Sequence, residues 1–243
     1  MTVFTFAKRT AKEILRDPLN LCFGLGFPLV LLVLLSAIQA NVPVELFEIR
    51  RLAPGIAVFG LAFMTLFSAT LIAKDRASAL LQRLYTTPLT PVDFILGYTL
   101  PMLPMALLQS ALCYGAAMLL GLAPSVHILY AVGMMLPVAL LYVALGLLCG
   151  SVLTDKQVGG ICGALLTNAS AWLSGIWFDL ELVGSTFRRI AHALPFVHAV
   201  ELERAALSGA WDSILPHLWW VLGYGIALLL LAVALFLRQM KRQ

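Results

Sequence analysis

Charged residues are scarce in this chain. Only 12% of its 243 residues are Asp, Glu, Lys or Arg, whereas 61% are hydrophobic, and the mean hydropathy is +0.96. A soluble domain usually carries about a quarter charged residues. A water-soluble fold of this length is therefore excluded, because it could not hide so much apolar surface. The sequence predicts an integral membrane protein whose apolar faces contact lipid.

Sequence motifs for catalysis and for metal binding are also missing. The chain has no G-x-x-x-x-G-K-[ST] phosphate loop, no H-E-x-x-H and no G-x-S-x-G, so it should not hydrolyse ATP and should not be an enzyme by itself. Its four cysteines lie in apolar stretches without paired spacing, which favours packed small side chains over disulfides or a metal. We expect no catalytic residue, no metal and no cofactor bound by this chain.

Six apolar stretches are long enough to cross a ~30 Å hydrocarbon core as helices. Their approximate bounds are 19–40, 53–73, 94–122, 127–153, 158–178 and 218–237. We interpret the first as a retained span rather than a cleaved signal peptide, because its apolar run is long. The prediction is an all-α integral membrane fold with six transmembrane helices in one domain, 1–243.

The spans have no charged residue near their centres. A charge there costs about 2.5–3.5 kcal/mol on insertion scales, so its absence argues against a proton-driven antiporter and an acidic cation channel. The net charge of +4 is explained by basic residues that face anionic headgroups. We expect membrane lipid as a partner and no nucleic acid, because no basic patch carries interleaved aromatics.

Residues 2–17 are predicted to form an amphipathic helix in the membrane interface. Apolar residues at helical spacing define one face: Val3, Phe4, Ala7, Ala11, Ile14 and Leu15. Eleven of the 16 Lys and Arg residues, including those of this helix, fall on one side of the predicted spans. The richer side is the cytoplasm, so both termini should be cytoplasmic. On the outer side, 179–217 should contain a pair of short helices that dip back toward the membrane.

The segment 74–91 follows the second span on the cytoplasmic side and reads as a short helix that Thr87-Pro88 ends. One interpretation is an ordinary interfacial connector. The other is a rigid helix that contacts a cytoplasmic partner, because a stiff helix bounded by prolines transmits force.

The pattern L-x-x-T-P at 84–88, followed by Gly97, resembles the first cytoplasmic loop of type-2 ABC transporter permeases. The motifs Ser174-Gly175-Ile176-Trp177-Phe178 and Leu194-Pro195-Phe196 follow in the family's order, so the resemblance extends along nearly the whole chain. The chain departs from the family pattern at Ala77 and Ala79, where Glu and Gly are frequent.

The resemblance implies a single transmembrane permease domain with a coupling helix in the first cytoplasmic loop and an outer re-entrant helix pair. It implies an exporter in a prokaryotic cell membrane, with two permease units, identical or related. Separate ATP-binding cassette subunits would hold ATP and magnesium. The implied coupling residues are Asp75, Arg76, Leu80, Leu81, Arg83, Leu84, Tyr85, Thr87 and Pro88.

Aromatic and polar side chains of spans two and five suggest a path for an amphipathic, drug-like or lipid-like cargo. These residues are Phe59, Phe63, Phe67, Thr167, Asn168 and Trp172. The alternative is that the phenylalanines face lipid or pack between helices. Two other functions stay open: a lipid or glycan exporter of the same family, and a membrane accessory or immunity protein that binds a partner without transport.

Overall fold

The computed structural model describes residues 3–42, 45–78 and 90–240, and all regular structure among them is helical. This confirms the predicted all-α class. In chain order the elements are α1 (Val3–Leu15), α2 (Pro18–Leu21), the π-helix η1 (Cys22–Gly26), α3 (Phe27–Asn41), the 3-10 turn η2 (Glu45–Phe47), α4 (Ile49–Ala77), α6 (Pro91–Leu119), α7 (Val126–Val152), α8 (Asp155–Val158), the π-helix η3 (Gly159–Leu166), α9 (Thr167–Leu173), α10 (Leu180–Val183), α11 (Ser185–Ala193), α12 (Pro195–Ser208) and α13 (Trp211–Met240).

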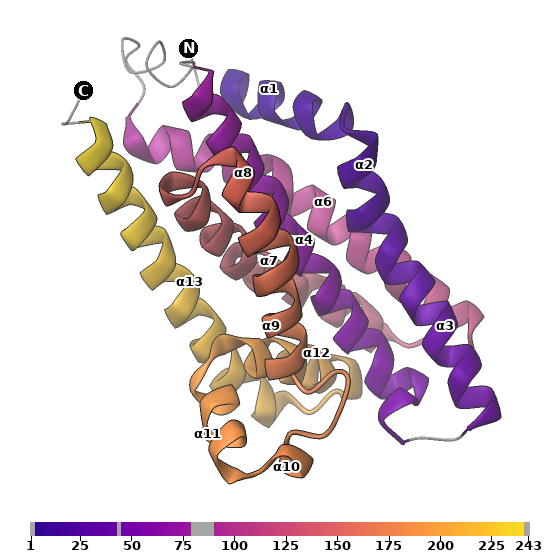
Figure 1. The fold of residues 1–243 in the computed structure, drawn as a ribbon. Coiled ribbons are helices and arrows are strands. Elements are labelled where there is room, and N and C mark those ends of the chain that lie inside the picture. The colour runs from indigo at the N-terminus through magenta and orange to yellow at the C-terminus, as the bar shows by residue number, and fades with distance from the viewer. Residues whose placement is uncertain (1–2, 43–44, 79–89, 241–243) are drawn as a thin grey trace.

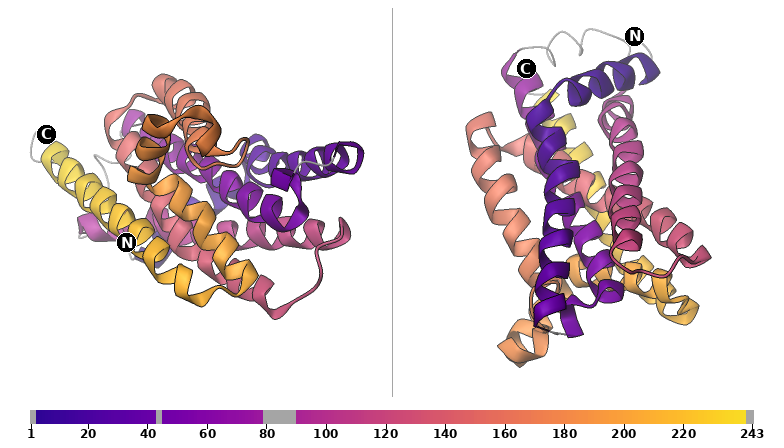
Figure 2. Two further views of the ribbon diagram at one scale, coloured as in Figure 1. Left: turned by 90° about the horizontal axis from the view of Figure 1, so that it is seen from below. Right: turned by 90° about the vertical axis from the view of Figure 1, so that its right-hand side faces the viewer.

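The long helices form one bundle with different structures at its two ends (Figure 1). Helix α1 lies across one end, which we call the α1 end, and α10 to α12 gather at the opposite end, which we call the α12 end. Helix α13 finishes at the α1 end, so both ends of the described chain lie on the same side of the bundle (Figures 1 and 2).

Among the residues that the structure describes, five helices are long and apolar enough to cross a membrane. They are Cys22–Asn41, Ile49–Ala77, Val92–Leu119, Val126–Val152 and Trp211–Leu235. They coincide within several residues with the predicted first, second, third, fourth and sixth spans. The chain is therefore a multi-pass membrane protein.

The predicted fifth span, 158–178, differs from the observed structure. Residues 155–173 are helical in three consecutive pieces, α8, η3 and α9, and they run beside α4 from the α1 end toward the α12 end (Figure 1). The helix finishes at Leu173, because Gly175 adopts φ +70° and turns the chain. Charged and polar residues such as Asp155 and Asn168 dilute the apolar run, and this segment is not among the five apolar helices.

Helix α4 forms the centre of the bundle. Every residue from 52 to 65 is buried, since α4 packs against α3, α6, α7, α12 and the segment 155–173. A helix that is apolar on all sides is typical of a protein core or a membrane span, and α4 is surrounded mostly by other helices.

Small residues allow α4 and α7 to approach closely. A Cβ added to Gly146 would overlap the side chain of Ser68, and one added to Gly150 would lie 2.7 Å from the carbonyl oxygen of Ala69. The Thr65 hydroxyl donates to the Tyr142 carbonyl across the same contact, at 2.8 Å. Close backbone approach at small residues is a main source of helix association in membranes.

Helix α12 is inserted into the α12 end of the bundle. Pro195 occupies its first turn, where a backbone N–H would have no helical acceptor, so its absence costs no hydrogen bond. Gly209 ends the helix with φ +75°. Its apolar side chains are buried against α4, α7 and α13. The predicted outer segment, 179–217, therefore contains α10, α11, α12 and the first turns of α13, and α12 belongs to the core.

Candidate functional site

The α1 end holds a buried ion pair between α1 and α4. The guanidinium of Arg9 donates two hydrogen bonds to Asp75, at 3.0 Å to Oδ2 and 2.8 Å to Oδ1. The Asp75 side chain is 7% exposed and that of Arg9 is 29% exposed. A two-pronged guanidinium–carboxylate pair fixes orientation as well as distance, so α1 is held in one position on the end of α4.

Tyr98 of α6 completes this junction. Its hydroxyl donates to Asp75 Oδ2 at 2.7 Å, and its ring meets the Phe6 ring of α1 edge to face, with centroids 5.0 Å apart. Phe6 is fully buried, and it fills the space beside Gly97 where any larger residue of α6 would collide. We call Arg9, Asp75, Tyr98 and Phe6 the α1 junction, since they connect α1, α4 and α6.

The contacts of α1 with the bundle shift the pKa values of its Arg9 and Glu13 side chains. The hydrogen bond from Arg9 to Asp75 raises the pKa of the guanidinium, so it stays charged. Burial raises the pKa of the Glu13 carboxyl, although its contact with Arg9 at 2.7 Å acts in the opposite direction. Lys8 and Lys12 are exposed on the outer surface of the helix.

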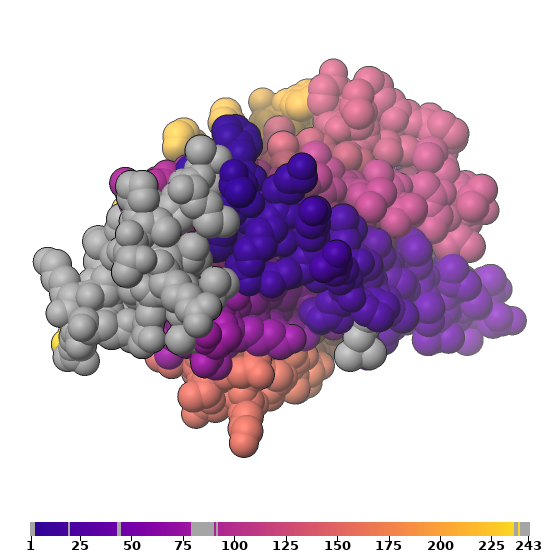
Figure 3. All heavy atoms as spheres, turned by 90° about the horizontal axis from the view of Figure 1, so that it is seen from above, coloured from indigo at the N-terminus to yellow at the C-terminus, as the bar shows by residue number. Residues whose placement is uncertain are grey.

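Helix α1 has a face buried against the bundle in addition to the apolar face that the sequence predicts for the membrane interface. The buried residues are Phe6, Thr10 and Ile14, whereas Phe4 is 81% exposed and Leu15 is 65% exposed. The helix therefore uses one face for the bundle and keeps apolar side chains on another. Figure 3, which looks onto this end, shows α1 in indigo lying across the molecule.

The first two predicted coupling residues are part of α4. The sequence analysis placed Asp75 and Arg76 in a short loop helix, but α4 continues without a break to Ala77. Arg76 donates to the carbonyl oxygens of Gly150 at 2.7 Å and Leu153 at 3.2 Å. These carbonyls belong to the C-terminal end of α7, where a cation is favourable. The remaining predicted coupling residues, Leu80, Leu81, Arg83, Leu84, Tyr85, Thr87 and Pro88, lie outside the described residues.

Two of the predicted path residues form an aromatic group. Phe59 and Phe63 of α4 are edge to face at 6.0 Å, and Phe27 contacts both rings. Phe23 stacks on Phe63 at 6.2 Å, and Trp177 meets Phe59 at 5.7 Å. Phe23 and Phe27 are 45% and 37% exposed, so the aromatic group reaches the surface along the first span.

The other predicted path residues are separate from this group. Phe67 is buried and packs on Gly24, where a Cβ would lie 2.6 Å from its ring. Thr167 donates to the Cys162 carbonyl at 2.9 Å, and Asn168 donates to the Ala164 carbonyl at 2.8 Å. Both therefore satisfy carbonyls of their own helix, and Trp172 is 55% exposed on the outside of α9.

A buried carboxyl in α12 was missed by the sequence analysis. Glu203 is fully buried, and Tyr114 of α6 donates to its Oε2 at 2.9 Å, while Oε1 has no partner within the described residues. Burial raises the pKa of Glu203 well above its usual value. No feature of the sequence indicated this burial, because Glu201 and Glu203 are both charged residues in a segment predicted to be an outer loop.

The sequence contains only weak indications that Arg9 and Tyr98 belong to the α1 junction. Arg9 lies among the basic residues of a helix expected to face headgroups, and Tyr98 lies in an apolar span. Phe23 and Phe27 are four residues apart on the first span, and Phe59 and Phe63 are four residues apart on the second. This helical spacing places each pair on one face of its helix and was the sequence signal for the aromatic group.

The comparisons agree with this architecture. Residues 1–207, from α1 nearly to the end of α12, match the family model described as ABC-2 type transporter. No curated protein matches the chain. Members of this family are membrane permeases, not ATPases, and generally work with an ATP-binding subunit. Since the match covers far more than half of the sequence, the chain belongs to the ABC-2 type transporter family.

Proposed function

We propose that the chain is the permease subunit of an ATP-driven exporter that moves an amphipathic small molecule out of the cytoplasm. In this proposal the segment 155–173 crosses the membrane as a sixth span, and the α1 end with both termini faces the cytoplasm. Two permease units, identical or related, enclose the path in a prokaryotic cell membrane. Separate ATP-binding cassette subunits bind ATP and magnesium and dock at the α1 end.

The observation that carries this proposal is the α1 junction. Arg9 and Tyr98 bind the same carboxylate, Asp75, from two different helices, at the end of α4 from which the segment 79–89 departs. A force on α1 or on that segment therefore acts on α4 and α6 together. This coupling is what a permease requires when its energy comes from another chain.

The aromatic group supports an amphipathic cargo. Phe59 and Phe63 lie on the central helix, and Phe23 and Phe27 extend the same aromatic surface outward along the first span. Aromatic side chains with few polar groups suit a ligand that is mostly apolar. A second permease unit facing this surface would enclose it.

The proposal is tested by purifying the chain with its candidate ATP-binding subunit and placing the complex in lipid vesicles. We expect a stable complex, ATPase activity that rises with added amphiphile, and ATP-dependent movement of a labelled amphiphile. Arg9→Gln should lower transport per ATP hydrolysed, whereas Lys12→Gln removes the same charge from the exposed side of α1 and should not.

Two further variants test the proposed coupling segment. Leu84→Glu and Arg83→Glu should separate ATPase activity from transport while the complex still assembles. Unchanged coupling in both would remove the role given to this segment. If a folded chain binds no ATP-binding subunit at all, the accessory function becomes the better description.

A further inference from the structure

A hollow at the α12 end is lined by basic and hydroxyl side chains. It has a volume of about 280 Å³, and its lining includes Arg50, Ser125, His127, Arg204 and Ser208. Among the residues that the structure describes, no Asp or Glu lines it. We call it the Arg50 hollow. The volume lies near the lower limit of small-molecule sites, so the hollow fits a headgroup better than a drug-sized ligand.

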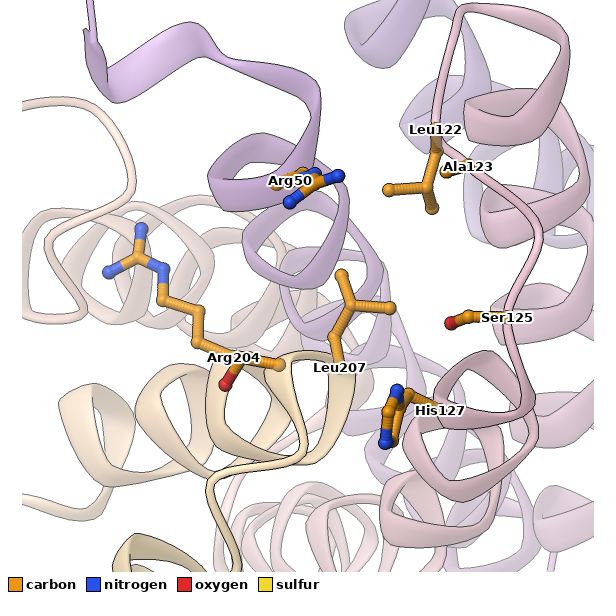
Figure 4. Close-up of a pocket in the computed structure, with 8 residues that line it drawn as sticks. Arg50, Leu122, Ala123, Ser125, His127, Arg204 and Leu207 are labelled. Atoms are coloured by element: carbon orange, nitrogen blue, oxygen red, sulfur yellow. The ribbon is translucent and has the colours of Figure 1, made fainter.

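Arg50 is a cation without a protein partner among the described residues. It lies in the first turn of α4, is exposed, and makes no ion pair or hydrogen bond within the described part of the chain. Arg204 is already engaged, because it donates to Glu201 at 2.7 Å and to the Arg51 carbonyl at 3.4 Å. Figure 4 shows the Arg204 guanidinium directed away from His127, and Arg50 at the side of the hollow that faces Leu122.

The opposite wall of the hollow is the start of α7. Ser125 is the residue before this 27-residue helix, and its hydroxyl makes no capping bond to the helix. The first N–H groups of a helix have no helical acceptor and carry partial positive charge. Arg50 and Ser125, the residue before α7, therefore line one hollow from two sides (Figure 4).

His127 is held in place on that wall. Its ring lies against Gly209, where a Cβ would be 2.7 Å from Nε2, and Gly209 also needs its positive φ of 75°. The close contact between α7 and the end of α12 thus fixes the floor of the hollow independently of any ligand.

A neighbouring hollow provides an internal comparison. It has a similar volume of about 290 Å³ and is lined by Arg51 and Arg188, but also by Asp179, Glu181 and Glu201. Its charges compensate one another, as in the pair Arg188–Glu181 at 3.0 Å. The consecutive residues Arg50 and Arg51 therefore line two hollows of similar size, of which only the first lacks acidic residues within the described chain.

The Arg50 hollow lies at the level of lipid headgroups. Tyr130, one turn from His127 along α7, meets Trp211 edge to face at 4.9 Å, and both rings are partly exposed. Trp219, two turns further along α13, is 69% exposed. Tyr and Trp are enriched where a membrane protein meets the headgroup region, and the apolar helices α4, α6 and α7 all begin or end here.

We propose that the Arg50 hollow binds the phosphate group of an anionic phospholipid in the leaflet at the α12 end. Arg50 supplies the charge, Ser125 and the start of α7 supply hydrogen-bond donors, and the acyl chains extend along the adjoining apolar helices. This binding does not depend on transport or on an ATP-binding subunit.

The test measures binding to the purified, delipidated full-length chain in a mild non-ionic detergent. The probes are phosphatidylglycerol, a diacylglycerol with the same acyl chains but no phosphate, and inorganic phosphate. Binding is followed by native mass spectrometry and by the fluorescence of the tryptophans near the hollow. We expect specific binding of phosphatidylglycerol, weaker binding of diacylglycerol, and no competition by inorganic phosphate at equal concentration.

Two neighbouring variants provide the matched comparison. Arg50→Gln should weaken phosphatidylglycerol binding about tenfold, the loss of roughly one charge-assisted hydrogen bond. Arg51→Gln removes the same charge from the next residue and should change binding by less than about twofold. Neither should alter diacylglycerol binding. Arg50→Lys, which keeps the charge, should restore part of the affinity and serves if the glutamine variant folds poorly.

Equal losses in Arg50→Gln and Arg51→Gln would overturn the proposal, because lipid would then respond to net charge alone. Equal binding of phosphatidylglycerol and diacylglycerol would overturn it as well, since the phosphate would contribute nothing. Full competition by inorganic phosphate would show that the hollow binds free phosphate, and it would overturn the assignment of a phospholipid as the ligand.

Discussion

Replacing Asp75 with Asn should weaken the α1 junction more than any change to an exposed charge of α1. The variant removes a negative charge that accepts two hydrogen bonds from Arg9 and one from Tyr98. Removing one partner of a buried ion pair costs about 3–5 kcal/mol. Because the Arg9 side chain is 29% exposed and can regain water, we expect a loss of about 2–3 kcal/mol in the free energy of unfolding.

A double-mutant cycle separates this interaction from the other effects of each substitution. Arg9→Gln, Asp75→Asn and the double variant should give a coupling energy of about 1–3 kcal/mol. Tyr98→Phe removes a single hydrogen bond to the carboxylate and should cost about 1.5 kcal/mol. Lys12→Gln is the control, since it removes a positive charge from the exposed side of the same helix and should cost less than about 0.5 kcal/mol.

The assay is reversible unfolding in mixed detergent micelles, followed by tryptophan fluorescence and circular dichroism at low salt. Repetition at high salt should change the coupling energy little, because buried pairs are screened less than exposed ones. The reasoning fails if Arg9→Gln and Asp75→Asn are additive within about 0.5 kcal/mol, or if Asp75→Asn is as mild as Lys12→Gln.

Three more predictions test other parts of the structure. For Glu203, the folded pKa is raised by burial, so its contribution to stability is fully present below about pH 4.3 and declines as pH rises through the folded pKa. Glu203→Gln should remove this decline, which is up to about 1.4 kcal/mol per pH unit in the free energy of unfolding. The measurement is unfolding of both proteins over a range of pH, and parallel curves of stability against pH would contradict the raised pKa of Glu203. Gly146→Ala should destabilise α4–α7 packing by about 1–3 kcal/mol. Gly133→Ala is the control on the same helix, because its added methyl group meets open space, and it should be neutral or stabilising by up to about 1 kcal/mol. Similar melting temperatures of the two variants would refute the close contact at Gly146. Phe63→Ala should lower the free energy of unfolding by about 3–5 kcal/mol, because the ring is buried. Phe23 is more exposed, so Phe23→Ala should alter transport of an amphiphile with little loss of stability. Unchanged transport of the amphiphiles by Phe23→Ala would contradict the proposed path.

Burial raises the pKa of Glu203 and so favours its neutral form in this fold. A neutral carboxyl can sit against Tyr114 between α12 and α6 without the cost of an isolated buried charge. Its second oxygen has no partner within the described residues, so the pair is held by one hydrogen bond and by the packing around it. The contact joins the α12 end to the same helix, α6, that forms part of the α1 junction.

Much of the architecture could be predicted from the sequence. Long apolar runs locate spans because backbone groups in lipid must be satisfied within a helix, and five of the six predicted stretches are apolar helices of sufficient length. Proline also marks helix boundaries, since α2 begins at Pro18 and α12 begins at Pro195, where the fixed backbone of proline suits a first helical turn. The fifth stretch is not among the five apolar helices, because Thr167, Asn168 and Gly175 interrupt its apolar pattern.

The partners of individual side chains depended on the tertiary structure. Asp75 meets Arg9 across 66 residues of chain and Glu203 meets Tyr114 across 89, and no local period connects such positions. Arg50 and Arg51 are identical residue types in sequence, but the packing of α4 between α7 and α12 places Arg50 in a hollow without carboxylates among the described residues and Arg51 in one lined by carboxylates. Composition and periodicity determine that a segment is helical and apolar, because those properties are local. Which charged groups meet is decided only when distant helices pack, because that packing alone sets the distances between them.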